Sequence, residues 1–280
     1  MKQASLYEEY ANNGYCFPLN IFSATEADDY ARRITELAES DIADSLGYRG
    51  QINQLHVIYP FVNQMIRNPT LLDAVESILG PNLMVWGVSI FMKPPQSEGF
   101  ISWHQDLTYW GLNNDQEVAA WIALSPVTRA NGCMRFIPGS HKLGQIEHRD
   151  TVNDSNILTR GQHADIDIDE DQALHVELKP GQASLHHGHL LHCSGANQTD
   201  QPRIGMVVNY ISTSVCQSVA STDYAMLVRG VDEYNHFEHL PAPQGELDAA
   251  GLDWHRKMLA AHQEALYDGA ANTESAPRLD

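Results

Sequence analysis

Short β-rich runs, separated by glycine, proline and asparagine, fill the middle of this 280-residue chain and constrain its fold more than any other feature. The runs lie at residues 83–92, 119–124, 134–137, 182–187 and 204–211. Many short strands with turn signals between them are typical of a β-sandwich or a β-barrel. We therefore expect a mainly β core, which would provide a rigid frame for a binding site.

Residues 1–82 are expected to form a mostly helical lead-in to this core. Ser23 and Glu26 have the spacing of a capping box, in which each side chain bonds the backbone N–H of the other residue. They predict a helix that reaches about residue 40. Asn68-Pro69 predicts the start of a second helix, because proline is favoured at the first helical position.

No linker long enough to separate two domains is present, so residues 1–280 are expected to form a single domain. It would comprise the lead-in (1–82), a core (83–215) with an insertion (145–175), and a C-terminal extension (216–280). Alternating Asp and Ile at residues 164–171 predicts a strand with one solvated face inside the insertion. The extension should contain an amphipathic helix at 254–267 and a frayed polar tail at 269–280.

The charge balance restricts the partners of the chain. Its 36 acidic and 17 basic residues give a formal net charge of −19, which should repel nucleic acid and anionic membrane surfaces. No apolar run approaches the roughly 18 residues that a membrane helix needs, and residues 1–10 lack the apolar stretch of a secretory signal. We expect a cytoplasmic protein that acts on a small molecule. The four cysteines form no CxxC pair, which speaks against a disulfide framework or a thiolate zinc site.

The segment Ser102-Trp103-His104-Gln105-Asp106-Leu107 carries the strongest chemical signal. On a strand, side chains two residues apart point to the same face, so His104 and Asp106 should point toward one position. An imidazole and a carboxylate can bind adjacent positions of a metal ion. One more histidine would complete a 2-His-1-carboxylate facial triad, which leaves three metal positions open.

A cluster of four histidines offers the third ligand: His186, His187, His189 and His192. If they lie on one strand, His186 and His192 face one side while His187 and His189 face the other. Those that are not ligands would pack or form hydrogen bonds near the metal. Eleven residues after His192, Arg203 begins an apolar strand, and a guanidinium can bind a carboxylate through two parallel hydrogen bonds. The distal carboxylate of 2-oxoglutarate fits such a site.

Four blocks in this order resemble the phytanoyl-CoA dioxygenase-like family of Fe(II)- and 2-oxoglutarate-dependent oxygenases, over roughly residues 83–212. They are Met92-Lys93-Pro94-Pro95, Trp103-His104-Gln105-Asp106, Asn131-Gly132-Cys133 with Ile137-Pro138-Gly139-Ser140-His141-Lys142, and residues 189–203. Each block alone is ordinary, and the ordered set is specific. The lead-in resembles the family more loosely, and the tail hardly at all.

The resemblance implies a double-stranded β-helix (jelly-roll, cupin-like) core with flanking helices. It also implies that iron is bound by His104, Asp106 and His192, because the family places the last ligand immediately before a turn of small residues. Arg203 and Ser194 would bind the distal carboxylate of 2-oxoglutarate, and Lys93 and Trp121 would line the cosubstrate pocket. The implied cofactors are Fe(II), 2-oxoglutarate and O₂.

Hydroxylation of an unactivated C–H bond, with release of succinate and CO₂, is the expected reaction. Desaturation or epoxidation at the same iron, a non-enzymatic jelly-roll that binds a ligand, and a zinc hydrolase are the alternatives. Related halogenases replace the carboxylate ligand by a small residue, so Asp106 argues against halogenation. The substrate pocket is expected to include His56, Gln105, Tyr109 and Trp110, and the substrate to be a small polar or zwitterionic metabolite. The oligomeric state and a lid role for the insertion stay open.

Overall fold

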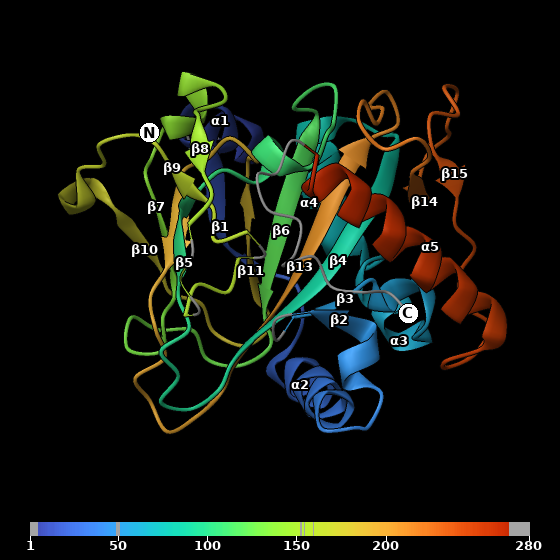
Figure 1. Cartoon of the computed structure of the whole chain (residues 1–280), viewed down its shortest axis with the longest axis horizontal. Helices are drawn as coiled ribbons and strands as arrows, with labels where there is room; N and C mark the ends of the chain where they lie inside the picture. The colour runs from blue at the N-terminus through green and yellow to red at the C-terminus, as the bar shows by residue number, and fades with distance from the viewer. Residues whose placement is uncertain (1–4, 49–50, 152, 154, 159, 269–280) are drawn as a thin grey trace.

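Two β-sheets pack face to face in the computed structural model, which describes residues 5–48, 51–151, 153, 155–158 and 160–268 (Figure 1). The large sheet has nine strands, with β1-β11-β6-β13-β4-β14-β15 along its main path and β2 and β3 attached through β4. The small sheet has the order β10-β7-β12-β5, and the two sheets do not close into a barrel. This arrangement confirms the predicted mainly β, double-stranded β-helix class.

The strands of the large sheet span both ends of the chain as well as its middle. They are β1 (Tyr15–Asn20), β2 (Gly47–Tyr48), β3 (Gln51–Asn53), β4 (Leu83–Lys93), β6 (Glu117–Ala123), β11 (Gln182–His186), β13 (Arg203–Ser212), β14 (Tyr224–Arg229) and β15 (Glu238–His239). The small sheet contains β5 (Ile101–His104), β7 (Met134–Phe136), β10 (Leu174–Val176) and β12 (His192–Ser194). A separate pair, β8 (His148–Arg149) and β9 (His163–Ala164), lies in the insertion.

Strand β13 is the centre of the large sheet and determines which side chains share its inner face. It pairs with β4 on one side and β6 on the other, with Arg203 opposite Lys93 and Asn209 opposite Gly87. Residues an even number apart on a strand face the same way, so Arg203, Val207 and Asn209 point together toward the space between the sheets. All three line the cavity described below.

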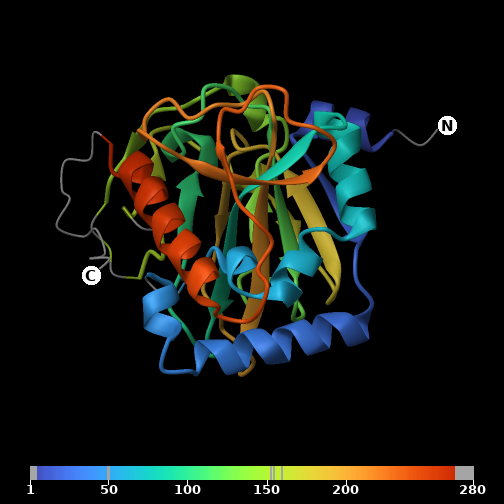
Figure 2. The ribbon, with the colours of Figure 1, turned by 90° about the vertical axis from the view of Figure 1, so that its right-hand side faces the viewer.

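Helices pack around the sheets (Figure 2). They are α1 (Leu6–Asn13), α2 (Ala24–Ala38), α3 (Pro60–Met65), α4 (Pro69–Leu79) and α5 (Ala249–Leu266). The predicted capping box is confirmed, since Ser23 Oγ accepts from the N–H of Glu26 at 3.2 Å and the Glu26 carboxylate accepts from the N–H of Ser23 at 2.8 Å. Pro69 begins α4, as predicted. No helix among the described residues has the length and apolar character that crossing a membrane requires.

Three features differ from the sequence expectations. The lead-in is not only helical, because its strands β1 and β3 pair with β11 and β4 of the large sheet. Helix α5 begins at Ala249, five residues before the predicted start, because the Asp248 side chain caps it by accepting from the N–H of Gly251 at 2.8 Å. The prediction of a strand at residues 164–171 is wrong, since β9 ends at Ala164 and covers only the first of these residues. The predicted frayed tail at 269–280 lies outside the described residues.

Local hydrogen bonds of one aspartate explain the missing strand. The Asp169 carboxylate accepts from the N–H of Asp171 at 3.2 Å and from Nε2 of Gln172 at 2.8 Å, which turns the chain into the short 3₁₀ helix Glu170–Gln172. Aspartate side chains that bond the nearby backbone compete with the hydrogen bonds of a sheet ladder. Alternation of Asp and Ile therefore did not suffice to predict a strand here.

A glycine in β13 allows the sheet to pack against Trp121, and this gives a first testable prediction. A Cβ at Gly205 would lie 2.1 Å from Cζ2 of Trp121, so Gly205→Ala must displace the indole or the strand. We expect it to lower the free energy of unfolding by about 2–3 kcal/mol, as overpacked cores do. Urea denaturation would measure the loss. Gly245→Ala is the matched control, because a Cβ there meets no atom within 4 Å, and equal stability of the two variants would contradict the prediction.

Candidate metal centre and cavity

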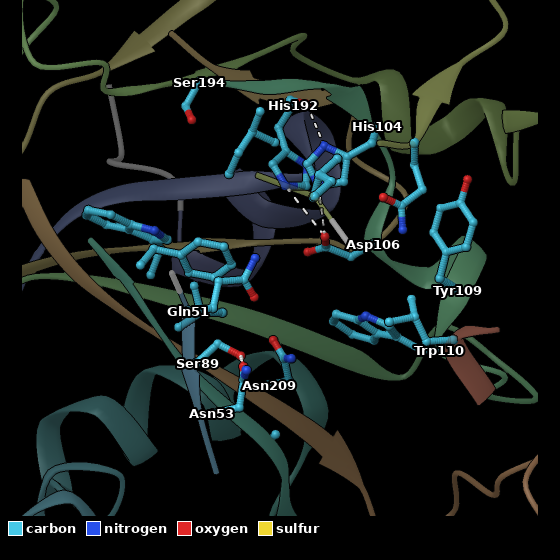
Figure 3. Close-up of a pocket in the computed structure, with 18 of the residues that line it drawn as sticks. Gln51, Asn53, Ser89, His104, Asp106, Tyr109, Trp110, His192, Ser194 and Asn209 are labelled. Carbon is cyan, nitrogen blue, oxygen red and sulfur yellow. Dashed lines mark hydrogen bonds and ion pairs between the residues drawn. The ribbon is translucent and has the colours of Figure 1, made fainter. Parts of the chain in front are cut away.

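Three side chains from the small sheet and its edge converge at one point (Figure 3). His104 ends β5, His192 begins β12, and these two residues are paired across the strands. Asp106 lies two residues beyond the end of β5, in the 3₁₀ helix Asp106–Tyr109. Asp106 Oδ1 is 3.2 Å from His104 Nε2 and 3.7 Å from His192 Nε2. The strand is shorter than expected, yet Gln105 is extended (φ −121°, ψ 132°), so the alternation continues to Asp106.

The backbone determines which ring nitrogen of each histidine faces this point. Nδ1 of His104 lies 2.9 Å from the carbonyl of Ser102 and 3.1 Å from that of His192, and Nδ1 of His192 lies 2.9 Å from the carbonyl of Leu190. A carbonyl only accepts, so both Nδ1 atoms donate. A neutral ring with hydrogen on Nδ1 has its lone pair on Nε2. Both lone pairs are thus available to a metal ion beside Asp106, as in metal sites whose histidines are oriented by outer hydrogen bonds.

The charge states also suit a divalent cation. Burial lowers the pKa of His192 to about 3, with a further contribution from His104, so its imidazole is neutral at pH 7. Burial alone would raise the pKa of Asp106, but the imidazoles of His192, His104 and His186 hold it well below its ordinary value. Metal binding requires unprotonated ligands. Two imidazoles and one carboxylate on one side of a metal are the ligands of the 2-His-1-carboxylate facial triad.

The remaining histidines of the cluster are placed differently from the prediction. His186 ends β11 in the large sheet, whereas His187 and His189 lie in the connection between β11 and β12 and not on a strand. Parity along one strand therefore does not apply to them. His186 nevertheless points inward, with Nε2 3.7 Å from Oδ2 of Asp106, and can orient the carboxylate oxygen that faces away from His104.

A second group of possible ligands, Asp115, His187 and His189, has less suitable chemistry. Nδ1 of His187 accepts from the backbone N–H of His189 at 3.0 Å. The neutral ring then carries its hydrogen on Nε2, which lies 3.5 Å from Oδ2 of Asp115. The lone pair of His187 is already used, and the Nε2–H faces the carboxylate. This group is therefore better described as a hydrogen-bonded cluster than as a metal site.

Two buried basic side chains, Arg203 and Lys93, lie near Ser194 at one end of the cavity. Arg203 is 1% exposed, donates from Nη1 to the carbonyl of Gly132 at 2.6 Å, and has no partner for Nε. Lys93 is 1% exposed and donates from Nζ to Ser194 Oγ at 2.7 Å. No acidic side chain of the described residues forms an ion pair with either cation. A buried charge without a counter-ion is costly, so this end is arranged for an anionic ligand.

One cavity of about 180 Å³ connects the three metal-ligand candidates with Arg203. Trp121, Ser194 and Arg203 line one part of it, while Tyr109 and Trp110 form a wall beside Asp106 (Figure 3). The floor opposite the histidines is polar, with Gln51, Asn53, Ser89 and Asn209 (Figure 3). The insertion and the C-terminal helix complete the lining with Leu158, Gln162, Leu259, His262 and Leu266.

Two residues expected in the substrate pocket do not line this cavity. His56 is fully buried among other groups, and burial lowers its pKa to about 3. Gln105 is also buried, and its amide bonds the backbone of Gly144, His189 and Ile146. Gln105 points away because it alternates with His104 and Asp106, and its contacts anchor the insertion against the loop before His192. Both residues stabilise the structure around the site and would not contact substrate.

Several lining residues were not singled out in the sequence. Asn209 lies six residues after Arg203 on the same strand, so the even spacing was a usable signal. Trp86 had no such signal, because it lies in a β-bulge. Asn209 pairs with Gly87 and the next residue, Tyr210, pairs with Val85, so Trp86 has no partner on β13. A bulge changes the direction of the extra side chain, and Trp86 lines the cavity.

The buried amino group of Lys93, which has no acidic partner among the described residues, leads to a prediction about stability. Burial, with a contribution from Arg203, lowers its pKa to about 6 in the folded protein. Between this value and an unfolded pKa near 10.4, the unfolded chain binds one more proton, so the free energy of unfolding should rise with pH across that window. Lys93→Met removes this dependence and should raise the Tm at pH 7 by about 2–6 °C without 2-oxoglutarate. Thermal melts at pH 6, 7, 8 and 9 would test this. Parallel pH profiles for the two proteins would contradict it.

Comparison with known proteins agrees with the fold. A family model described as phytanoyl-CoA dioxygenase matches residues 10–205. A probable phytanoyl-CoA dioxygenase of Caenorhabditis elegans is 31% identical over 168 residues. That match covers 57% of this chain and 54% of the relative, so the chain spans about half the length of this curated relative.

Solved structures extend the similarity over nearly the whole chain. The non-heme monooxygenase ThoJ, in its apo form, superposes with a TM-score of 0.83 at 32% identity, covering 94% of this chain and 98% of ThoJ. EvdO2 from Micromonospora carbonacea var. aurantiaca, solved in complex with 2-oxoglutarate, superposes with a TM-score of 0.62 at 25% identity. This second match covers 75% of the present chain and 91% of EvdO2.

Proposed function

Because this chain belongs to the phytanoyl-CoA dioxygenase family, we propose that it is an Fe(II)- and 2-oxoglutarate-dependent dioxygenase that hydroxylates a C–H bond of a small molecule. One observation carries the proposal. A three-residue metal-ligand set and a buried arginine without a counter-ion, Arg203, lie on the same cavity. We also propose that the chain is a single domain, because β1 and β14 from its two ends both join the large sheet.

His104, Asp106 and His192 are the proposed iron ligands. Their Nε2 and carboxylate atoms already point toward one position, so binding requires little rearrangement. Three protein ligands leave three metal positions for small molecules. His186 would hold the second oxygen of Asp106 and favour binding through one carboxylate oxygen.

Arg203, with Ser194 and Lys93 beside it, is the proposed site for the distal carboxylate of 2-oxoglutarate. The free Nε of Arg203 offers a charge-assisted donor to that carboxylate, and Lys93 donates to Ser194 Oγ beside it. Trp121 lines the same cavity, with its ring 5.3 Å from the guanidinium of Arg203. With one end held there, the 2-oxo acid end of the cosubstrate would face the ligand set.

When bound, Fe(II) would couple the oxidative decarboxylation of 2-oxoglutarate by O₂ to oxidation of the substrate. The overall reaction balances as substrate C–H, O₂ and 2-oxoglutarate giving substrate C–OH, succinate and CO₂. The protein orients the two organic molecules and excludes water, with Tyr109 and Trp110 as one wall. Asp106 occupies the position that halogenases leave for chloride, which favours hydroxylation over halogenation.

Anaerobic absorption spectroscopy tests the proposal directly. We expect a weak charge-transfer band in the visible when the metal-free protein receives both Fe(II) and 2-oxoglutarate, and no band with either one alone. Succinate release under air would then depend on both. If Fe(II) binds and 2-oxoglutarate produces no band, the site does not chelate the 2-oxo acid, and a hydrolase or a binding protein on this fold would replace the oxygenase.

A further inference from the structure

The polar residues on the floor of the cavity indicate which chemical group the substrate carries. This inference rests on the proposed function. We propose that the substrate carries a carboxamide group, which Asn53 and Asn209 bind from two sides. A carboxamide offers one hydrogen-bond acceptor and one donor side by side. The free polar atoms of these two asparagines are one donor and one acceptor.

Charge restricts the substrate first. Among the described residues that line the cavity, Asp106 is the only acid and Arg203 is the only permanent cation. The proposed function assigns Asp106 to iron and Arg203 to 2-oxoglutarate. The floor is built from Gln51, Asn53, Gln54, Ser89, Asn209 and Gln162. A charged substrate group there would lose its hydration without gaining a counter-ion, which is costly. The floor therefore favours an uncharged group that forms hydrogen bonds.

The orientation of Asn53 leaves a donor free. This residue ends β3 and is 4% exposed. Its Oδ1 accepts from the hydroxyl of Ser89 at 2.7 Å, while its buried Nδ2 has no partner. A buried donor that is left unsatisfied costs about 1–3 kcal/mol, and most such groups in proteins have a partner. A substrate carbonyl would be such a partner.

Asn209 leaves an acceptor free. It lies on β13 opposite Gly87, and its Oδ1 is buried without a partner. Strand β4 separates it from Asn53 and contributes only the short Ser89 and the side-chain-free Gly87 between them. A Cβ at Gly87 would lie 3.3 Å from Nδ2 of Asn209, so glycine keeps this space open. The N–H of a substrate amide would satisfy Oδ1 of Asn209.

The other amides of the floor are already engaged. Gln51 Nε2 donates to the carbonyl of Ile157 at 3.0 Å. Gln54 accepts from the N–H of Val88 at 3.1 Å and contacts Nδ1 of His262 at 2.8 Å. Gln162 accepts from the N–H of Arg160 at 3.2 Å. These residues brace the floor against the insertion and helix α5, which leaves the binding of substrate to Asn53 and Asn209.

A flat apolar surface stands beside the floor. The Trp86 indole donates its N–H to Asp223 at 2.7 Å, so it presents ring carbon to the cavity. Its ring centroid is 5.2 Å from that of Trp110 and 4.1 Å from that of His262. Aromatic walls favour a planar or apolar body. The inferred substrate therefore combines a carboxamide with such a body, either as a free small molecule or as part of a peptide.

Four matched probes test the carboxamide on the wild-type protein. Phenylacetamide, phenylacetate and phenylacetone share a ring and differ in the polar group, and N-acetylphenylalanine N-methylamide represents a peptide. Each is titrated by calorimetry into anaerobic protein loaded with Fe(II) and 2-oxoglutarate. We expect phenylacetamide or the peptide analogue to bind at least about tenfold more tightly than the acid and the ketone. Whichever of the two binds more tightly identifies the source of the amide. Equal or tighter binding of the acid or ketone, or no binding of either amide, would overturn the inference.

Two variants locate the binding group. Asn53→Asp keeps the acceptor for Ser89 and replaces the free donor, and Asn209→Leu removes the free acceptor at similar volume. Each should weaken amide binding about tenfold. Phenylacetone has the carbonyl but no N–H, so its binding should weaken in Asn53→Asp and stay unchanged in Asn209→Leu. Unchanged amide binding in both variants would overturn the assignment. Asn12→Asp, at an exposed asparagine outside the cavity lining, is the control for the added charge. The charge-transfer band, recorded on the same samples, reports separately on the proposed function, because calorimetric binding of the amide does not depend on it.

Discussion

Asp106→Ala is expected to weaken Fe(II) binding by more than about 100-fold and to reduce succinate release to the background rate. The carboxylate is the one ligand that contacts both histidine Nε2 atoms, at 3.2 and 3.7 Å, and it supplies the only negative charge of the set. Loss of residues that merely orient metal ligands already costs about 10–100-fold in affinity or activity, so loss of a ligand should cost more. Iron content after gel filtration and a succinate assay would measure both effects.

Asp115→Ala is the matched control for this substitution. Asp115 also lies beside two histidines, but the lone pair of His187 is occupied by the backbone N–H of His189. Its removal should leave one equivalent of iron bound and turnover unchanged. Normal iron binding by Asp106→Ala, or equal losses in both variants, would show that the ligand assignment is wrong.

Arg203→Leu is expected to raise the KM for 2-oxoglutarate about 100-fold while iron remains bound. The guanidinium is buried, lacks an acidic partner among the described residues, and has a free Nε, so its charge is available to the cosubstrate. Removing one member of a buried charge pair costs about 2–5 kcal/mol, and 2.7 kcal/mol corresponds to 100-fold. Burial lowers the pKa of Arg203 only to about 10, so it stays charged at neutral pH.

A second cosubstrate separates binding of the distal carboxylate from general damage. Pyruvate has the 2-oxo acid group and no distal carboxylate, so the preference for 2-oxoglutarate over pyruvate should collapse in Arg203→Leu. Arg229→Leu is the control, because Arg229 already pairs with Asp73 and Glu76 at the surface. A retained preference in Arg203→Leu would remove this arginine from the proposed site.

The core strands were predictable from the sequence to within two residues at each end. β-rich runs bounded by turn residues sufficed for β4, β6, β7, β11 and β13, because strands buried in a sheet select such residues directly. The approach of His104 to Asp106 was also predictable, since it needs only two residues of extended backbone. The strand at 164–171 failed because Asp169 bonds its own neighbours, which alternation does not reveal.

Contacts between distant segments were beyond the sequence. The placement of His186 beside Asp106 depends on the large sheet facing the small one, not on the spacing of the histidines. The free Nδ2 of Asn53 likewise depends on Ser89 of another strand, which the sequence does not pair with it. Trp86 entered the cavity through a bulge, which no residue pattern announces.

Strand β13 has a consequence for how the proposed oxygenase could acquire new substrates. Arg203 stands at its first residue and Asn209 six residues later, which places their Cα atoms about 20 Å apart at the usual rise of a strand. Covalent geometry therefore sets the spacing between the carboxylate end and the amide end, and movement of the insertion or of α5 does not alter it. Exchanging Val207 or Asn209 would change what is bound without shifting Arg203, so selectivity can diverge while the oxidation chemistry is inherited intact.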